Sequence, residues 1–532
     1  MFIDTGRMSE VFDPKGLHPA GDEEEAALEY PGPHRVETLG GSVEVRWVEE
    51  PGLSMNGPLI YFIEFVNKTG LWKRWVETCP LKYTSSNAPS KEEILGTILL
   101  SVLSGHRRYA HITGLRGDQT MAEMLGVKKL RSEDSVRRAF EKQDEQELTL
   151  WMDLNLGETF EALLEGDWIL DVDATVKTLY GKQEEARVGY NPVKPGRPSH
   201  VYHAMLFTAA KLVLNVDLQA GNQTASLYGQ DGMWGFLEAR DRRQWPTLVR
   251  GDCGHGNEEM MAGCESRGLR YLFKLKQSKG VVKLVEKLSW GHGRAGWKPV
   301  GQGWEAAEHP LQLQGWSRAR RVIVMRRRLE KAPDQETGAS GQLSLPGWAI
   351  ETAPGAWYEH AALVTNWEEQ ELLAIAQLYR DRGDAENQFD ELKNQWGWRG
   401  YSTQDLKRSQ LMARIVALIY NWWSIYTRMA TGSRHGEATT TRPALQHGVA
   451  RATRHANQVR LWLGSVHARA RHIANLLAGF SIWLRQVLAG AEQLNELERW
   501  NRVLRRIFQD FAGINLDPAG VPRLLGPSNC RI

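Results

Sequence analysis

One charged segment of the chain, LYRDRGDAENQFDELKNQW, carries side chains that could act together on a phosphate group. The segment predicts a helix, and because an ideal helix turns by about 100° per residue, four side chains share an arc of about 60°. These four are Tyr379, Arg382, Glu386 and Lys393. Two cations flank one carboxylate, so the cations could bind a phosphate group while the carboxylate is directed at it. The alternative is a solvent-facing helix stabilised by salt bridges, because Arg382 and Glu386 have i,i+4 spacing.

Aspartates on two predicted strands are candidate partners for that helix face. DWILDVDATV alternates apolar and polar residues, so Asp171 and Asp173 lie on one face of a strand. PTLVRGDCGHG predicts a second strand that ends at Asp252. Carboxylates at strand ends in an open α/β sheet usually converge on one site, and unpaired buried carboxylates are costly. We therefore expect Asp173 and Asp252 to join Glu386; strand-end capping and salt bridges are the alternative.

The donor atoms of this set favour a hard metal ion. Carboxylates without a Cys or His ligand set suit Mg²⁺. The four cysteines form no CxxC pair, so neither a zinc site nor a disulfide framework is indicated. A pair of ions suits in-line displacement at phosphorus, because one activates the nucleophile and the other stabilises the leaving oxygen. We expect two Mg²⁺ ions, with Mn²⁺ as the alternative metal.

Other polar residues near these segments have weaker claims. Asp171 shares the strand face with Asp173, and we expect it to make hydrogen bonds rather than to bind a metal. Asp390 lies on the helix face of Glu386 and rivals it on geometry alone. His255, which follows the second strand, is expected to be structural rather than to contact DNA.

Basic residues outside the helix could also reach phosphate. Lys194 and Arg197 lie in the loop LYGKQEEARVGYNPVKPGRPSH, where the alternative is plain solvation. RRVIVMRRR predicts a strand on which Arg326 and Arg328 share one face that could line DNA.

The N-terminal third of the chain has two kinds of predicted structure. Residues 1–90 form an acidic tail with short strands at SVEVRWVEE and LIYFIEFVN. Residues 91–150 are helical, with a turn at Gly126 and Ser132 as a helix N-cap. This spacing fits either a helix-turn-helix that binds DNA or a helical pair that only packs.

The remaining regions differ in pattern and charge. Strands and helices alternate in 151–276 and 359–400, whereas 277–358 holds β-like runs rich in Gly and Trp and reads as a basic insertion. Residues 401–532 are helical, with 18 basic against seven acidic residues, while residues 1–100 have nine against 16. The excess in the C-terminal region is nearly all Arg, which suggests an anionic partner.

Nothing in the sequence predicts a membrane protein. The longest uncharged apolar run, Ile415–Thr427, has 13 residues, which is too short to span a bilayer and predicts a buried helix. The start, MFIDTGRMSE, has neither a basic n-region nor an apolar h-region, so no signal peptide is expected. We expect a cytoplasmic protein.

The motifs together resemble a known family. The spacing Y-x2-R-x3-E-x6-K matches the signature of the DDE transposases of bacterial insertion-sequence families 4 and 1380. DVDAT resembles their first-aspartate strand, VRGDCGHG resembles their second-aspartate segment, and the loop that contains Lys194 is similar to that of the 1380 subgroup. The resemblance implies an α/β fold: a ribonuclease H-like catalytic core with a β-rich insertion, flanked by helical N-terminal and C-terminal regions.

The resemblance also implies roles for the matched residues. Asp173, Asp252 and Glu386 would be the catalytic, metal-binding triad. The family implies cleavage at the terminal inverted repeats, a hairpin intermediate, and joining of the 3′-hydroxyl to target DNA. It further implies a homodimer that brings two double-stranded transposon ends together, in a bacterial, nucleoid-associated setting.

By the same resemblance, Tyr379, Arg382 and Lys393 would bind phosphates near the transposon end. Two other functions stay open. One is a metal-dependent nuclease or junction enzyme on the same core, which cuts without joining. The other is an inactive DNA-binding regulator that uses only the helix-turn-helix and the Arg-rich C-terminal region.

Overall fold

The computed structural model divides the chain into two compact units, Met1–Pro51 and Gly52–Ile532. In the first unit, the described part is an antiparallel hairpin of β1 (His34–Thr38) and β2 (Gly41–Val45). The predicted strand SVEVRWVEE begins in β2, and its remainder, like the acidic tail at 1–32, lies outside the described residues. The structure describes residues 33–45, 52–83, 88–290, 296–331, 348–432, 435–456, 458–464 and 469–511.

The second unit is a mixed α/β structure whose described residues form an eleven-stranded mixed sheet. Its centre contains β4 (Ile169–Thr178), β6 (Pro198–Phe207), β7 (Leu212–Ala220), β8 (Leu248–Gly251) and β9 (Arg270–Lys274). β4 pairs antiparallel with β6, and β6 pairs antiparallel with β7. On its other edge β4 pairs in parallel with β8, which pairs in parallel with β9. β4 and β8 match the strands predicted from DWILDVDATV and PTLVRGDCGHG.

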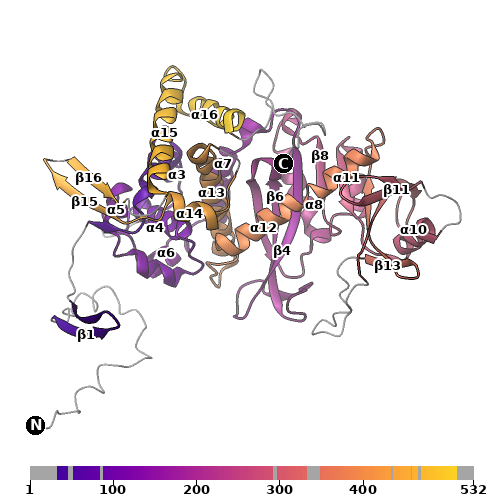
Figure 1. Cartoon of the computed structure of the whole chain (residues 1–532), viewed down its shortest axis with the longest axis horizontal. Helices are drawn as coiled ribbons and strands as arrows, with labels where there is room; N and C mark the ends of the chain where they lie inside the picture. The colour runs from indigo at the N-terminus through magenta and orange to yellow at the C-terminus, as the bar shows by residue number, and fades with distance from the viewer. Residues whose placement is uncertain are drawn as a thin grey trace, which may run out of the picture. The chain divides into compact units, whose positions relative to one another are not determined.

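Helices cover both faces of this sheet because its strand residues alternate between two buried clusters. α8 (Ala225–Glu238) and α9 (Glu258–Ser266) pack on one face. α11 (Leu372–Arg380) covers the other and is followed by α12 (Gly383–Gln395), so that both run along the sheet (Figure 1). The cluster on the α11 side includes Leu248, Leu272, Ile323, Leu363, Leu372, Ile375 and Ala376.

The predicted insertion contains strands, but they extend the central sheet rather than build a separate one. α10 (Lys279–Trp290) comes first in the chain. Outward from β9, the sheet continues through β14 (Ala356–Thr365), β12 (Arg320–Arg328) and β11 (Trp304–Leu311). The short strands β10 (Lys298–Pro299) and β13 (Trp348–Ala353) complete this side.

The suggestion that Arg326 lines DNA is not supported, because its side chain is engaged within the protein. Its Nε donates to Glu305 at 2.8 Å, and its guanidinium lies 3.9 Å from the ring centroid of Trp297 and 4.7 Å from that of Tyr358. Arg328, which shares its strand face, is exposed at the end of β12.

The helical region after residue 90 contains α4 (Lys91–Leu103), α5 (Gln119–Met124), α6 (Glu133–Arg138) and α7 (Glu145–Gly157). Ser132 caps α6 as expected, by accepting a hydrogen bond from the backbone N–H of Ser135. The connection between α5 and α6 is longer than the three or four residues of a helix-turn-helix turn, and each helix has only six residues. DNA contact by this pair stays a prediction.

The strand predicted at LIYFIEFVN is wrong. LIYFIEFVN is a helix, α2 (Ile60–Lys68), followed by α3 (Leu71–Glu77), and not a strand. Phe62, Phe65 and Val66 are buried on one side of α2, where Phe62 packs edge-on against Tyr426. A short apolar run cannot be assigned from periodicity alone, and here packing on the helical core decides.

The C-terminal region is helical, with one exception. α13 (Leu406–Thr431) is buried over most of its length, as predicted for the run inside it. α14 (Ala438–Leu445), α15 (Ala470–Ala489) and α16 (Glu496–Phe511) follow. An unexpected hairpin, β15 (Ala450–His455) and β16 (Gln458–Leu463), pairs with β3 (Leu53–Ser54). Among the described residues, no helix combines the length and the apolarity that crossing a bilayer requires.

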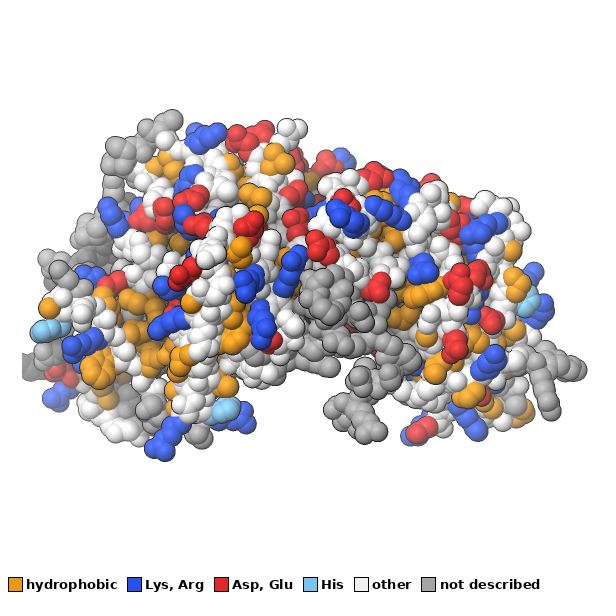
Figure 2. Space-filling model, turned by 90° about the horizontal axis from the view of Figure 1, so that it is seen from above, with side chains coloured by type: hydrophobic (Ala, Val, Ile, Leu, Met, Phe, Trp, Pro, Cys, Tyr) orange, Lys and Arg blue, Asp and Glu red, His pale blue; other side chains and the backbone are white. Residues whose placement is uncertain are grey.

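Much of the C-terminal Arg excess serves internal contacts. Arg414 is buried and donates to Asp217 at 2.7 Å, and Arg442 lies 4.2 Å from the ring centroid of Trp396. On the face drawn in Figure 2, Lys and Arg side chains are interspersed with Asp and Glu among the described residues. The Arg count therefore overstates the charge available to a partner.

A buried ion pair joins the strands that precede the candidate site. Arg250 donates from Nε to Asp171 Oδ1 at 2.7 Å and from Nη2 to Oδ2 at 2.8 Å. The two residues are paired across β4 and β8, and both are at most 5% exposed. Arg250 Nη1 also donates to the backbone carbonyl of Leu378. One guanidinium thus ties both strands to α11, and Asp171 has the hydrogen-bonding role that we expected.

We predict that Asp171→Asn lowers the free energy of unfolding by roughly 3–5 kcal/mol, because it leaves Arg250 buried without its counter-charge. The measurement is the urea unfolding midpoint. Glu147→Gln, which removes an exposed salt bridge to Lys82, is the control and should cost less than about 1 kcal/mol. Equal midpoints for the two variants would contradict the structural role of the buried pair.

Candidate active site

Asp173 and Asp252 come together because their strands are neighbours. Val172 is paired with Gly251 in the parallel register of β4 and β8, so the next residues, Asp173 and Asp252, lie side by side. Burial raises the pKa of Asp173 to about 6, and the nearby charge of Asp252 adds to the increase, while Arg382 opposes it. The side chain of Asp173 is 17% exposed. The convergence expected from the strand ends is therefore present for these two aspartates.

Asp252 is held as a carboxylate by the turn that follows it. Its Oδ1 accepts hydrogen bonds from the backbone N–H of Gly254 and from Nδ1 of His255, each at 2.9 Å. Burial alone would raise the pKa of Asp252, but the hydrogen bond and charge of His255 and the backbone of Gly254 outweigh it and hold the pKa at about 2. His255 is buried, so its contact is with Asp252.

Arg382 connects Asp173 to the glutamate of the helix. Its Nη2 donates to Asp173 Oδ2 at 3.1 Å, and its Nη1 donates to Glu386 Oε1 at 2.7 Å. The Arg382 side chain is 7% exposed, whereas that of Glu386 is 65% exposed. The i,i+4 salt bridge between Arg382 and Glu386, which was the alternative interpretation, is present. Arg382 also bonds to Asp173 on β4, however, and a helix that faced only solvent would make no such contact.

The long helix expected around these residues is interrupted. α11 ends at Arg380 and α12 begins at Gly383, and the backbone N–H of Arg382 bonds to the carbonyl of Tyr379, three residues back. The side chain of Arg382 thus starts from a tight turn between the two helices. Lys211 contacts the start of α12 by donating to the backbone carbonyl of Asp384 at 3.0 Å.

Tyr379 belongs to the same group. Burial raises the pKa of its phenol to about 12, against the charge of Arg382, and the charges of Glu386 and Asp252 raise it further. Its hydroxyl is therefore protonated at neutral pH and can act as a hydrogen-bond donor beside the carboxylates.

Three of the predicted phosphate contacts lie elsewhere. Lys393 lines a groove next to the C-terminal end of α12. Lys194 and Arg197 are exposed in the loop after β5 (Arg187–Val188), where Arg197 lies 5.8 Å from the ring centroid of Tyr180. Asp390, the geometric rival of Glu386, is exposed and accepts a hydrogen bond from Asn394 one turn later.

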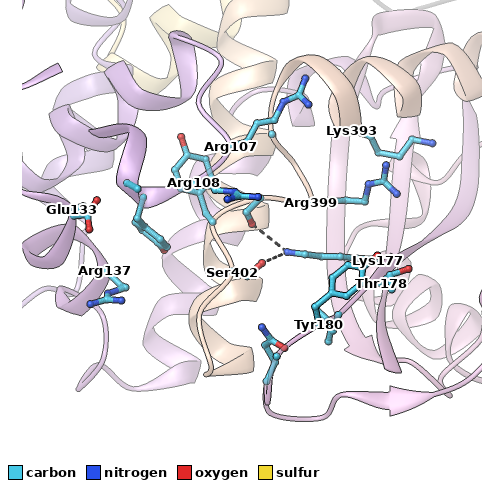
Figure 3. A pocket seen from close by; sticks show the side chains of 18 of the residues that line it. Arg107, Arg108, Glu133, Arg137, Lys177, Thr178, Tyr180, Lys393, Arg399 and Ser402 are labelled. Carbon is cyan, nitrogen blue, oxygen red and sulfur yellow. Dashed lines mark hydrogen bonds between the residues drawn. The ribbon is translucent and has the colours of Figure 1, made fainter. Parts of the chain in front are cut away.

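The groove contains basic residues that the sequence interpretation did not single out. Figure 3 shows Lys393, Lys177 and Arg399 on one side and Arg107 and Arg108 opposite. Lys177 could have been found, because it continues the alternation that places Asp171 and Asp173 on one strand face. The others carry no pattern in the sequence, since they follow helices or precede turns.

The oxygen atoms of these carboxylates are suitable ligands for a divalent cation, but the three side chains do not converge on one point. Within the described residues, no three or more His, Cys, Asp or Glu side chains gather closely enough to hold a metal ion. The reason is local: Arg382 lies between Asp173 and Glu386 and neutralises both. Asp173 and Asp252 remain a pair of adjacent oxygen ligands whose mutual repulsion a hard cation would relieve.

We predict a pH-dependent effect of Asp173→Asn on the metal-free protein. An ordinary Asp titrates near about 3.9, so a folded-state pKa of about 6 means that folding takes up a proton at Asp173. The stability from this protonation is present below about pH 4 and is lost as pH rises through about 6. The variant should therefore raise the thermal midpoint, relative to the parent, more at pH 8 than at pH 5.

The measurement is thermal denaturation in EDTA at both pH values. Asp390→Asn, at an exposed position on α12, is the control and should shift neither midpoint. The same shift for Asp173→Asn at both pH values would contradict a raised pKa.

Comparison with known proteins identifies the family. The family described as "Transposase DDE domain group 1" matches residues 50–481. Among solved structures, the cryo-EM structure of the piggyBac transposase synaptic complex with hairpin DNA matches at 12% identity and a TM-score of 0.37, covering 90% of each chain. No curated protein matches the sequence. Since the family match spans most of the chain and both aspartates and the glutamate, the protein belongs to the DDE transposases.

Proposed function

We propose that this transposase cuts an insertion sequence at its terminal inverted repeats and joins the freed 3′-hydroxyl ends to target DNA. Family membership makes it a DNA-cleaving enzyme of the DDE class. The observation that carries the finer proposal is that one arginine, Arg382, links Asp173 to Glu386, while Asp252 lies beside Asp173 on the adjacent strand. Such a cluster of carboxylates and cations suits displacement at a phosphodiester.

Asp173, Asp252 and Glu386 are the proposed catalytic and metal-binding triad. Members of this family use divalent metal ions, and we propose two Mg²⁺ ions, for which Mn²⁺ can substitute. Bound there, the ions would activate the attacking oxygen and stabilise the leaving oxygen. Support comes from the oxygen-only donor set and from the adjacency of Asp173 and Asp252 on paired strands, where the charge of Asp252 adds to the increase that burial causes in the pKa of Asp173.

The neighbours of the triad have proposed roles of their own. His255 and the Gly254 backbone hold Asp252 ionised and oriented at neutral pH. Arg382 and Tyr379 direct a guanidinium and a phenolic O–H toward the same place, and both are donors that phosphate oxygens accept. When a phosphate occupies the site, Arg382 can exchange a carboxylate partner for it without leaving its turn.

We propose that β4, β6, β7, β8 and β9 form a ribonuclease H-like core, with 277–358 as its insertion. The support is the strand topology. On one side of β4, β6 pairs antiparallel with β4 and β7 pairs antiparallel with β6, whereas on the other side β8 and β9 run parallel to β4. The proposed partners are double-stranded DNA, as transposon ends and as target, and a second copy of this chain in a synaptic complex.

We predict that Asp173→Ala, Asp252→Ala and Glu386→Ala each abolish Mg²⁺-dependent cleavage of supercoiled DNA while leaving duplex binding in EDTA intact. Each variant removes a proposed metal ligand. Asp390→Ala, on the same helix but bonded only locally, is the matched control and should cleave like the parent. Parent-like cleavage by any of the three variants would refute the assignment of that residue.

A strand-transfer assay separates a transposase from a nuclease on the same core. The protein is incubated with Mg²⁺, plasmid and a pre-cleaved end that bears a 3′-hydroxyl. We expect a joined product, because the same site that cuts can present the 3′-hydroxyl as nucleophile. Cleavage without joined product would favour the nuclease, and loss of both would favour the DNA-binding regulator.

A further inference from the structure

A basic groove of about 650 Å³ opens beside the candidate active site (Figure 3). Four segments that are far apart in the sequence line it: residues 107–110, α6, the end of β4 with the residues that follow it, and the end of α12 with the residues that follow it. A second hollow shares Arg137 and Ser402 with it and extends it toward Arg408. The six cations that line the basic groove are Arg107, Arg108, Arg137, Lys177, Lys393 and Arg399.

The charge of the basic groove is one-sided. Of its described lining residues, Glu133 is the single acid against six cations. This contrasts with the face of Figure 2, where charges of both signs are interspersed. A concave surface with one sign of charge concentrates oppositely charged ligands.

The walls of the basic groove are joined by backbone contacts, so its shape is built before any ligand binds. The guanidinium of Arg107 donates to the carbonyl of Asn394, and the backbone N–H of Tyr401 donates to the carbonyl of Arg107 at 3.1 Å. A side chain at Gly400 would overlap that carbonyl, so glycine permits the close approach.

Two of the cations are close together without a carboxylate between them. Lys177 donates to the hydroxyl of Ser402, and Arg399 donates to the carbonyl of Val176 at 3.2 Å. Burial lowers the pKa of Lys177 to about 8, and the charge of Arg399 lowers it further. An anion bound here would reduce this repulsion and keep Lys177 charged.

The basic groove continues from the carboxylates on two elements at once. Lys177 lies on the same strand face as Asp173, and Lys393 lies two turns along α12 from Glu386. A nucleic-acid strand whose phosphate reached the carboxylates would therefore place its next phosphates in the basic groove.

We propose that the basic groove binds the phosphate backbone of the DNA duplex on one side of the bond that is cut. This proposal rests on the proposed function, because that function identifies the bond that is cut. Its test measures binding alone and does not depend on cleavage. Double-stranded DNA is the occupant that we favour, because six cations lie on both walls of the groove and a duplex carries a dense, continuous array of phosphates. The basic groove ends at α6, within the region predicted to contact DNA, which would extend the same track.

Binding of a short duplex of mixed sequence, measured in EDTA at several salt concentrations, tests the proposal. The paired variant Lys177→Gln/Arg399→Gln should weaken binding and make the slope of log K against log salt shallower by about 2, because about 0.9 of slope is lost per phosphate contact. The paired variant Arg108→Gln/Arg137→Gln should also weaken binding and make the slope shallower. Because both of these side chains are exposed, this variant tests the groove even if the first variant misfolds.

The control is Arg243→Gln, which removes an 88% exposed arginine that does not line the basic groove. It should leave the slope of log K against log salt at the parent value. Lys177→Arg, which keeps the positive charge, should also have the parent slope. Parent-like slopes for both paired variants would overturn the proposal, as would duplex RNA of the same sequence binding with equal affinity and equal sensitivity to the variants.

The outcome is independent of the catalytic assignment. If Asp173→Ala still cleaves while the groove variants lose their salt dependence, the proposed triad fails and the groove stands. If the triad variants are inactive and the groove variants bind like the parent, the groove fails and the proposed function stands.

Discussion

Buried negative charge is the constraint on which the centre of this protein depends. Asp171 and Asp173 occupy one face of β4 beneath α11 and α12, where a carboxylate without a counter-charge would be costly. Arg250 neutralises the first and Arg382 the second, and each arginine comes from a different element. Satisfying these charges therefore determines how β8 and the helix pair are placed against β4.

The same requirement gives the two arginines different functions. Arg250 is bonded to both oxygens of Asp171 and to a backbone carbonyl, so it has little freedom and acts as a structural tie. Arg382 makes one bond to each of two carboxylates and starts from a turn. It can therefore exchange partners when a phosphate or a cation arrives, whereas Arg250 cannot without breaking the packing of α11.

Charge also separates the candidate active site from the basic groove beside it. The first gathers carboxylates and is suited to cations, while the second gathers Lys and Arg and is suited to phosphates. The two regions share β4 and α12, since Asp173 and Lys177 lie on one strand face and Glu386 and Lys393 on one helix. A single DNA strand could thus meet both without any rearrangement of these elements.

Periodicity in the sequence by itself determined the strands around the site. β4 alternates apolar and polar residues, so its acidic face was predictable, and Asp252 was predictable as the end of a short apolar run. Periodicity failed for α2, because a short apolar run does not by itself distinguish a helix from a strand, and it did not reveal the break between α11 and α12 at Arg382.

Tertiary structure alone decided the partners of these residues. Nothing local indicates that Arg250 pairs with Asp171, that Arg382 reaches Asp173, or that Arg107 and Arg399 face each other across a groove. Local sequence sets which side of an element a residue occupies, because backbone geometry repeats every few residues. Which distant side chain it meets depends on the strand register and on long-range packing, and these exist only in the folded chain.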